Sequence, residues 1–91
     1  MGRKIFEWDD PTDPDGNVVH IAAHDVTTDE AESVVRNGKN PVTRSGSSTY
    51  PITFGRTKTG KYLAVIWFAR GDNPEIIRVL TAYPVNPPKR R

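Results

Sequence analysis

The stretch KYLAVIWFAR, residues 61–70, contains seven consecutive apolar residues and is the strongest indication of the fold in this sequence. A run of this length that is rich in β-branched and aromatic residues is typical of a central β-strand, and we expect both of its faces to be covered. PEIIRVLTAY (74–83) alternates between two faces, and RGDNP (70–74) is typical of a turn. These segments predict an antiparallel hairpin at the centre of a sheet.

Shorter elements precede this hairpin. The alternation in residues 4–8 predicts a first strand, and residues 17–24 carry apolar side chains at helical spacing. Thr27 and Glu30 form a capping box that predicts the start of a second helix over residues 28–37. Residues 41–54 then predict strand structure, in which Pro51 favours a sheet edge.

This order predicts one α+β domain over residues 1–86, followed by a short basic tail over residues 87–91. We expect two N-terminal helices packed on one face of a mostly antiparallel sheet of four or five strands. The other face of that sheet is expected to stay open.

Composition narrows the class of protein. Ninety-one residues allow only one hydrophobic core. Cysteine is absent, which excludes disulfides, thiolate nucleophiles and cysteine-based zinc sites. No apolar run approaches the roughly 20 residues of a membrane helix, and the N-terminus lacks the apolar segment of a secretory signal. We therefore expect a cytoplasmic protein with no membrane contact.

Charge is unevenly distributed along the chain, although the formal net charge is only +2. Residues 7–32 hold nine of the eleven acids, whereas residues 36–91 hold eleven basic residues against two acids. A basic surface of this kind favours RNA or an acidic protein partner. The alternative is a solvated surface that keeps the protein soluble.

GRTKTGKY, residues 55–62, is one residue away from the phosphate-binding pattern G-x-x-x-x-G-K-[ST], because Tyr62 replaces the serine or threonine. A strand follows it, rather than the helix whose N-terminal amides would bind phosphate. The stretch therefore predicts a hairpin loop in which Gly55 and Gly60 supply permissive backbone. Three cations of this loop are expected to point to solvent: Arg56, Lys58 and Lys61.

His20 and His24 are four residues apart on a predicted helix, a spacing that lets two imidazoles share a zinc ion. Ile21 stands where a metalloprotease needs glutamate, and the sequence suggests no third ligand. The acidic residues 9–16 lack the glutamate-ended loop of a calcium site. We expect neither a metal nor another cofactor.

Basic and aromatic residues of the second half are the candidates for function. A buried position for Arg78 beside Ile76 and Leu80 would be costly, which predicts either an open face for this strand or a guanidinium group that reaches the sheet edge. Guanidinium groups bind phosphates, and aromatic rings stack on unpaired bases, so such a face suits RNA. The alternative is a surface that packs on a partner. The residues expected to bind RNA are Arg44, Arg56, Lys58, Lys61, Lys89, Arg90 and Arg91.

Several short motifs resemble, in the same order, the patterns of BrnT-type toxins. They are FEWD (6–9), HDVT (24–27) followed by EA (30–31), GKYLAV (60–65), and IRV (77–79) followed by TAY (81–83). The resemblance covers roughly residues 5–83. It implies a RelE-like fold and the toxin of a type II toxin–antitoxin system, neutralised by a DNA-binding antitoxin encoded beside it.

The resemblance further implies a metal-independent endoribonuclease that inhibits translation, in which the ribose 2′-hydroxyl attacks the adjacent phosphate. Arg70 and Arg78 match arginines of the family and are expected to bind phosphate and stabilise the transition state. Tyr83 stands where many relatives place another arginine, and acid–base work is its candidate role.

The chain also departs from the family's pattern. Many relatives carry glutamate just before the arginine that matches Arg70, and Ala69 stands there instead. An obvious base is therefore missing from that position. A non-catalytic RNA-binding or protein-binding module of the same fold is the alternative function.

Overall fold

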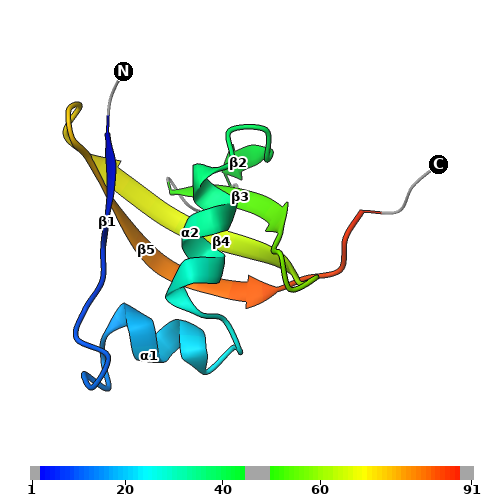
Figure 1. The fold of residues 1–91 in the computed structure, drawn as a ribbon, viewed down its shortest axis with the longest axis horizontal. Helices are drawn as coiled ribbons and strands as arrows, with labels where there is room; N and C mark the ends of the chain where they lie inside the picture. Colours follow the sequence, from blue (N-terminus) through cyan, green and yellow to red (C-terminus); the bar gives the residue numbers. More distant parts are fainter. Residues whose placement is uncertain (1–2, 45–49, 89–91) are drawn as a thin grey trace.

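The computed structural model describes residues 3–44 and 50–88. Its elements in chain order are β1 (Lys4–Glu7), α1 (Asn17–Ala22), α2 (Thr28–Arg36), β2 (Val42–Arg44), β3 (Pro51–Arg56), β4 (Tyr62–Arg70) and β5 (Glu75–Pro84). The strands form one sheet in the order β1-β5-β4-β3-β2. Helix α2 lies across one face of this sheet. Helix α1 lies beside the part of β5 that extends beyond its pairing with β1 (Figure 1).

The fold class expected from the sequence is wrong. The chain does not begin with a layer of two helices on a mostly antiparallel sheet: it begins with β1, which pairs in parallel with β5 and makes the sheet mixed. The helices contain only six and nine residues, so the fold is mostly β. Helix α1 ends at Ala22 because the chain turns there and Asp25 adopts a φ of 63°.

Strand β4 is central, as KYLAVIWFAR predicts, but it is not covered on both faces. Only Leu63, Ala64 and Val65 are buried, and the rest of the strand is half-buried or exposed. The core lies between α2 and the sheet, where Val34 of the helix packs with Val65 and neighbouring strand residues. Among the described residues no helix lies on the opposite face, which we call the open face (Figure 1).

Both hairpins expected from the sequence are confirmed, since β3 pairs with β4 and β4 pairs with β5 in antiparallel registers. The position expected for Pro51 is wrong, because β2 pairs with β3 and takes the edge. Pro51 is the first residue of β3, a position where proline is tolerated.

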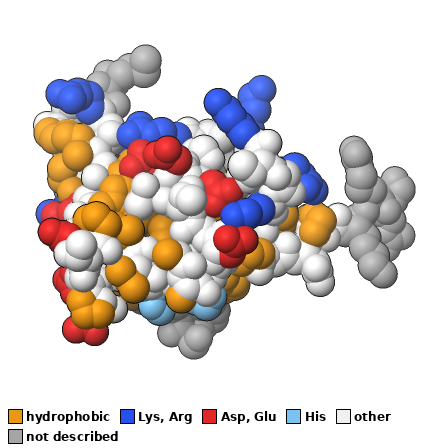
Figure 2. Space-filling view, turned by 60° about the horizontal axis from the view of Figure 1, so that its bottom comes forward, with side chains coloured by type: hydrophobic (Ala, Val, Ile, Leu, Met, Phe, Trp, Pro, Cys, Tyr) orange, Lys and Arg blue, Asp and Glu red, His pale blue; other side chains and the backbone are white. Residues whose placement is uncertain are grey.

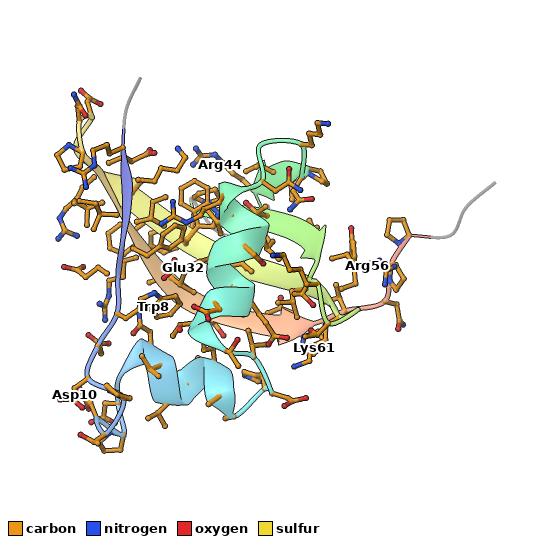
Figure 3. The ribbon with its side chains drawn as sticks, in the orientation of Figure 1. Trp8, Asp10, Glu32, Arg44, Arg56 and Lys61 are labelled. Carbon is orange, nitrogen blue, oxygen red and sulfur yellow. The ribbon has the colours of Figure 1, made fainter. Side chains whose placement is uncertain are left out.

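The capping box of α2 is confirmed and extends beyond the helix. Thr27 accepts a hydrogen bond from the backbone N–H of Glu30, and the Glu30 carboxylate accepts one from the backbone N–H of Thr27. Glu30 also accepts hydrogen bonds from the Thr59 hydroxyl at 2.6 Å and from Lys61 Nζ at 3.2 Å. The GRTKTGKY loop is thereby fastened to the start of α2, where Lys61 lies (Figure 3).

Where β1 ends, the Asn17 side chain takes over its role as a hydrogen-bond partner of β5. Strand β1 pairs with β5 only as far as Glu7 opposite Arg78, and the Asn17 side-chain amide then donates to the backbone oxygen of Val79 at 3.0 Å. The Asn17 side-chain oxygen accepts from the Asp9 N–H at 2.9 Å. Asn17 is buried, so these bonds satisfy groups that water does not reach.

We expect Asn17→Ala to lower the free energy of unfolding by about 1–3 kcal/mol, because it leaves the buried Val79 carbonyl and the part-buried Asp9 N–H unpaired. Urea denaturation measures the change, with the exposed Asn86→Ala as the matched control. Equal stability of the two variants would contradict this role of Asn17.

Candidate functional site

Arg70 and Arg78 converge on one carboxylate, that of Glu7. Arg70, at the end of β4, donates to the two Glu7 oxygens at 3.2 and 2.9 Å. Arg78 of β5 lies 3.8 Å from the same carboxylate. Phe6 and Trp8 pack toward the core, so Glu7 between them faces the other way, onto the open face. Arg70 and Arg78 therefore meet on one surface.

Arg78 has a second carboxylate partner. It donates to the two Asp9 oxygens at 3.2 and 2.7 Å, and Asp9 also accepts from the backbone N–H of Asn17 at 2.9 Å. The four charged side chains form a continuous row, which we call the arginine–carboxylate ladder: Arg70, Glu7, Arg78 and Asp9.

The ladder lowers the pKa of both carboxyl groups. The pKa of Glu7 falls below 4.5 chiefly because Arg70 donates hydrogen bonds to its charged form. The pKa of Asp9 falls below 3.8 chiefly because Arg78 donates to it, with a further contribution from the Asn17 N–H. Both groups are therefore ionised at neutral pH, and the ladder carries two positive and two negative charges.

Aromatic and aliphatic side chains cover the open face beside the ladder. In the sheet register, Phe68 of β4 lies opposite Arg78, and Ile66 lies opposite Thr81. The Tyr50 ring lies 5.9 Å from the Phe68 ring, and side chains of Ile52 and Phe54 share this face by the alternation of β3. All five of these hydrophobic side chains are accessible to solvent at least in part.

Tyr83 lies on the open face too, because the bulge between Ile66 and Trp67 shifts the alternation along β5, but it is not at the ladder. It is five residues beyond Arg78 on β5, or about 16 Å at the usual rise per residue. Its ring is 6.1 Å from that of His24, whose own ring is 5.6 Å from that of His20. The two histidines gather at the α1 edge (pale blue in Figure 2). His20 and Arg78 also line one small depression of about 160 Å³.

The remaining cations expected to bind RNA do not gather into one site. Arg44 and Arg56 lie at separate places on the sheet, and Arg56 donates to the Gly60 carbonyl at 3.1 Å (Figure 3). Lys58 is exposed in the hairpin loop. Lys89, Arg90 and Arg91 lie outside the described residues.

The expectation that Lys61 points to solvent is wrong. Its ammonium group lies 3.2 Å from Glu30 and 3.4 Å from Asp25, and it also donates to the Asp25 carbonyl. Burial lowers the pKa of Lys61, but the hydrogen bond to Glu30 and the nearby carboxylates outweigh this and raise it. Lys61 thus serves to hold the loop on α2.

The acidic first half of the chain therefore pairs with its basic second half. Glu7, Asp9 and Glu30 each meet a cation from β4 or β5 or from the loop before β4. Acidic and basic side chains accordingly lie near one another over the surface seen in Figure 2. Because of this pairing, the charge asymmetry of the sequence does not produce the strongly basic face that it suggested.

Sequence reasoning missed Glu7 and Asp9 as members of the site. Their signal was present in FEWD (6–9), where two carboxylates alternate with two core aromatics. Recognising them requires the parallel pairing of β1 with β5, which places Glu7 beside Arg78.

A metal site is not assembled by these carboxylates. Within residues 3–44 and 50–88, no group of three or more histidine, aspartate or glutamate side chains is placed to hold a metal ion. In the same residues, neither helix has the length and apolar character needed to cross a membrane.

Comparison of the chain with protein-family models, with curated proteins and with solved structures finds no match. We therefore infer the function from the ladder and the open face around it.

The lowered pKa values make stability depend on acid pH. Because Glu7 and Asp9 bind fewer protons when folded than when unfolded, their contribution is complete above about pH 5 and is lost as pH falls through the folded pKa values. We expect the melting temperature to fall below pH 4.5 in the wild type, and to fall less steeply in the Glu7→Gln/Asp9→Asn double variant. An unchanged acid limb in that variant, followed by circular dichroism, would refute the assignment.

Proposed function

We propose that the protein is a toxin-type endoribonuclease that binds single-stranded RNA on the open face of its sheet. The observation that carries the proposal is the convergence of Arg70 and Arg78 on one small area of that face, marked by the Glu7 carboxylate between them.

The arginines keep free donor capacity despite their ion pairs. A guanidinium group has five N–H donors, and each bidentate pair with a carboxylate uses two of them. A phosphate has room to approach Arg70 in particular, because 54% of its side chain is exposed. An RNA phosphate at this point takes up donors from two arginines, and its developing charge is stabilised by both.

The aromatic side chains beside the ladder suit unpaired bases. Tyr50 and Phe68 lie side by side, and Phe68 is opposite Arg78 in the register. A base stacked on such a ring contributes about 1–3 kcal/mol to binding without requiring a particular sequence. A strand held by the arginines through its phosphate therefore has a stacking surface for the adjoining bases.

The reaction that the motif resemblance implies is attack of the ribose 2′-hydroxyl on the adjacent phosphate, with Arg70 and Arg78 stabilising the charge. Tyr83 is about 16 Å from Arg78 along β5, so its role in the proposal is contact with a neighbouring nucleotide rather than acid–base work. A DNA-binding antitoxin partner, arrest of translation and a cytoplasmic location belong to the same proposal and depend on the motif resemblance alone.

A non-catalytic RNA-binding or protein-binding module is the second candidate. It is favoured by the pairing of both arginines with carboxylates, which neutralises the ladder, and by Ala69 in the place of the relatives' glutamate. An RNA-binding module of this kind would bind RNA in the same place but would not cut it.

We expect Arg70→Ala to weaken binding of a single-stranded RNA oligonucleotide about 10-fold and to lower its cleavage rate by at least 100-fold, because the arginine contacts the phosphate in both ground and transition states. Fluorescence anisotropy measures binding, and gel analysis of an end-labelled oligonucleotide measures cleavage.

Arg36→Ala is the matched control, since Arg36 lies on α2 over the Phe6 ring and away from the open face. Binding without any cleavage by the wild type would leave the binding module as the function. Equal RNA affinity for the wild type, Arg70→Ala and Arg36→Ala would overturn the ribonuclease and the RNA-binding module.

A further inference from the structure

We propose that the Glu7 carboxylate is the catalytic base that accepts the proton of the attacking 2′-hydroxyl. The inference rests on the proposed ribonuclease function and adds a proton acceptor for its first step.

Position 69 is a poor place for that base in this fold. Ala69 packs against the core and lies opposite the fully buried Ile77 in the register. Arg70, the next residue, points to the opposite face of the strand. A carboxylate at position 69 would thus lie across the sheet from the two arginines.

Glu7 brings a carboxylate to the open face from a different strand. Its oxygens lie 2.9 Å from Arg70 and 3.8 Å from Arg78, and 41% of the side chain is exposed. A phosphate bound by the remaining donors of these arginines lies next to this carboxylate, within the reach of a general base. Asp9 is less suitable because it accepts a third hydrogen bond, from the Asn17 N–H, besides the two from Arg78, whereas Glu7 accepts two, from Arg70.

Glu7 is in the ionised form that a proton acceptor needs. The hydrogen bonds from Arg70 hold its pKa below 4.5, so the group is an ionised acceptor at neutral pH. The charged groups that face it are Arg70 on β4, Arg78 on β5 and Asp9 beyond the end of β1.

The step is balanced without a metal or other co-reactant. Glu7 takes the 2′-hydroxyl proton while the 2′-oxygen forms its bond to phosphorus. The bond from phosphorus to the 5′-oxygen breaks, and that oxygen takes a proton from water. The products are a 2′,3′-cyclic phosphate end and a 5′-hydroxyl end, and Glu7 then returns its proton to solvent.

The purely structural alternative is that Glu7 only ties β1 to the sheet. Glu75 offers a matched control, because its ion pair with Lys4 at 2.8 Å joins the same two strands away from the arginines. Glu7→Gln removes the ion pairs with Arg70 and Arg78, and Glu75→Gln removes the ion pair with Lys4, but only the first removes the proposed base.

We expect Glu7→Gln to lower kcat for cleavage of a single-stranded RNA oligonucleotide by about 10²–10⁴-fold with little change in KM, since the base acts only in the transition state. Glu75→Gln is expected to keep kcat within threefold of the wild type. Glu7→Asp restores a carboxylate and is expected to recover part of the lost rate. Melting temperatures and RNA affinities are measured for all three variants.

The assignment of Glu7 is overturned if Glu7→Gln cleaves within threefold of the wild type, if Glu75→Gln loses as much activity, or if Glu7→Asp is as inactive as Glu7→Gln while both stay folded. Those outcomes leave the ribonuclease proposal intact, provided that the wild type cuts and Arg70→Ala does not. A wild type that cuts no RNA removes both proposals.

Discussion

The ion pair between Asp9 and Arg78 is the interaction on which the arrangement of this molecule depends. Arg78 sits on β5, next to the centre of the sheet, and Asp9 stands just beyond β1, at the start of the loop that leads to α1. Through the Asn17 N–H, the same carboxylate also fixes the first turn of α1. One contact thus aligns a strand, a loop and a helix along the edge of β5.

This edge would otherwise expose unpaired backbone groups. β1 satisfies the first part of β5, and the Asn17 amide satisfies the Val79 carbonyl where β1 ends. The ladder continues these contacts onto the open face through Glu7 and Arg70. The interactions that close the edge therefore also place two arginines and two carboxylates together, and structure and proposed chemistry share the same side chains.

Local patterns in the sequence predicted the local structure well. The T-x-x-E box gave the start of α2, and apolar runs separated by turn residues gave both hairpins, because these signals act over a few residues. The parallel pairing of β1 was not predictable in this way, since it depends on contacts such as Lys4 with Glu75, which lie 71 residues apart. The fold class was missed for that reason.

The same limit applies to the candidate site. Arg70 and Arg78 were found from the sequence, but their carboxylate partners were not, because those partners lie on β1 and in the loop after it. Lys61 was assigned to the surface because a hairpin loop is normally solvated, whereas the half-buried contact with Glu30 depends on where α2 lies. The acidic and basic halves of the chain thus form ion pairs with each other in the fold.

We propose that RNA meets this protein at the ladder on the open face. Nuclear magnetic resonance can test it directly, by following side-chain signals of the uniformly labelled protein during titration with a single-stranded RNA oligonucleotide. We expect the largest chemical-shift changes at the guanidinium groups of Arg70 and Arg78 and at the Phe68 ring. The side-chain signals of Arg36 on α2 are expected to stay unchanged. Shifts confined to the α2 side of the molecule, or none at saturating RNA, would contradict it.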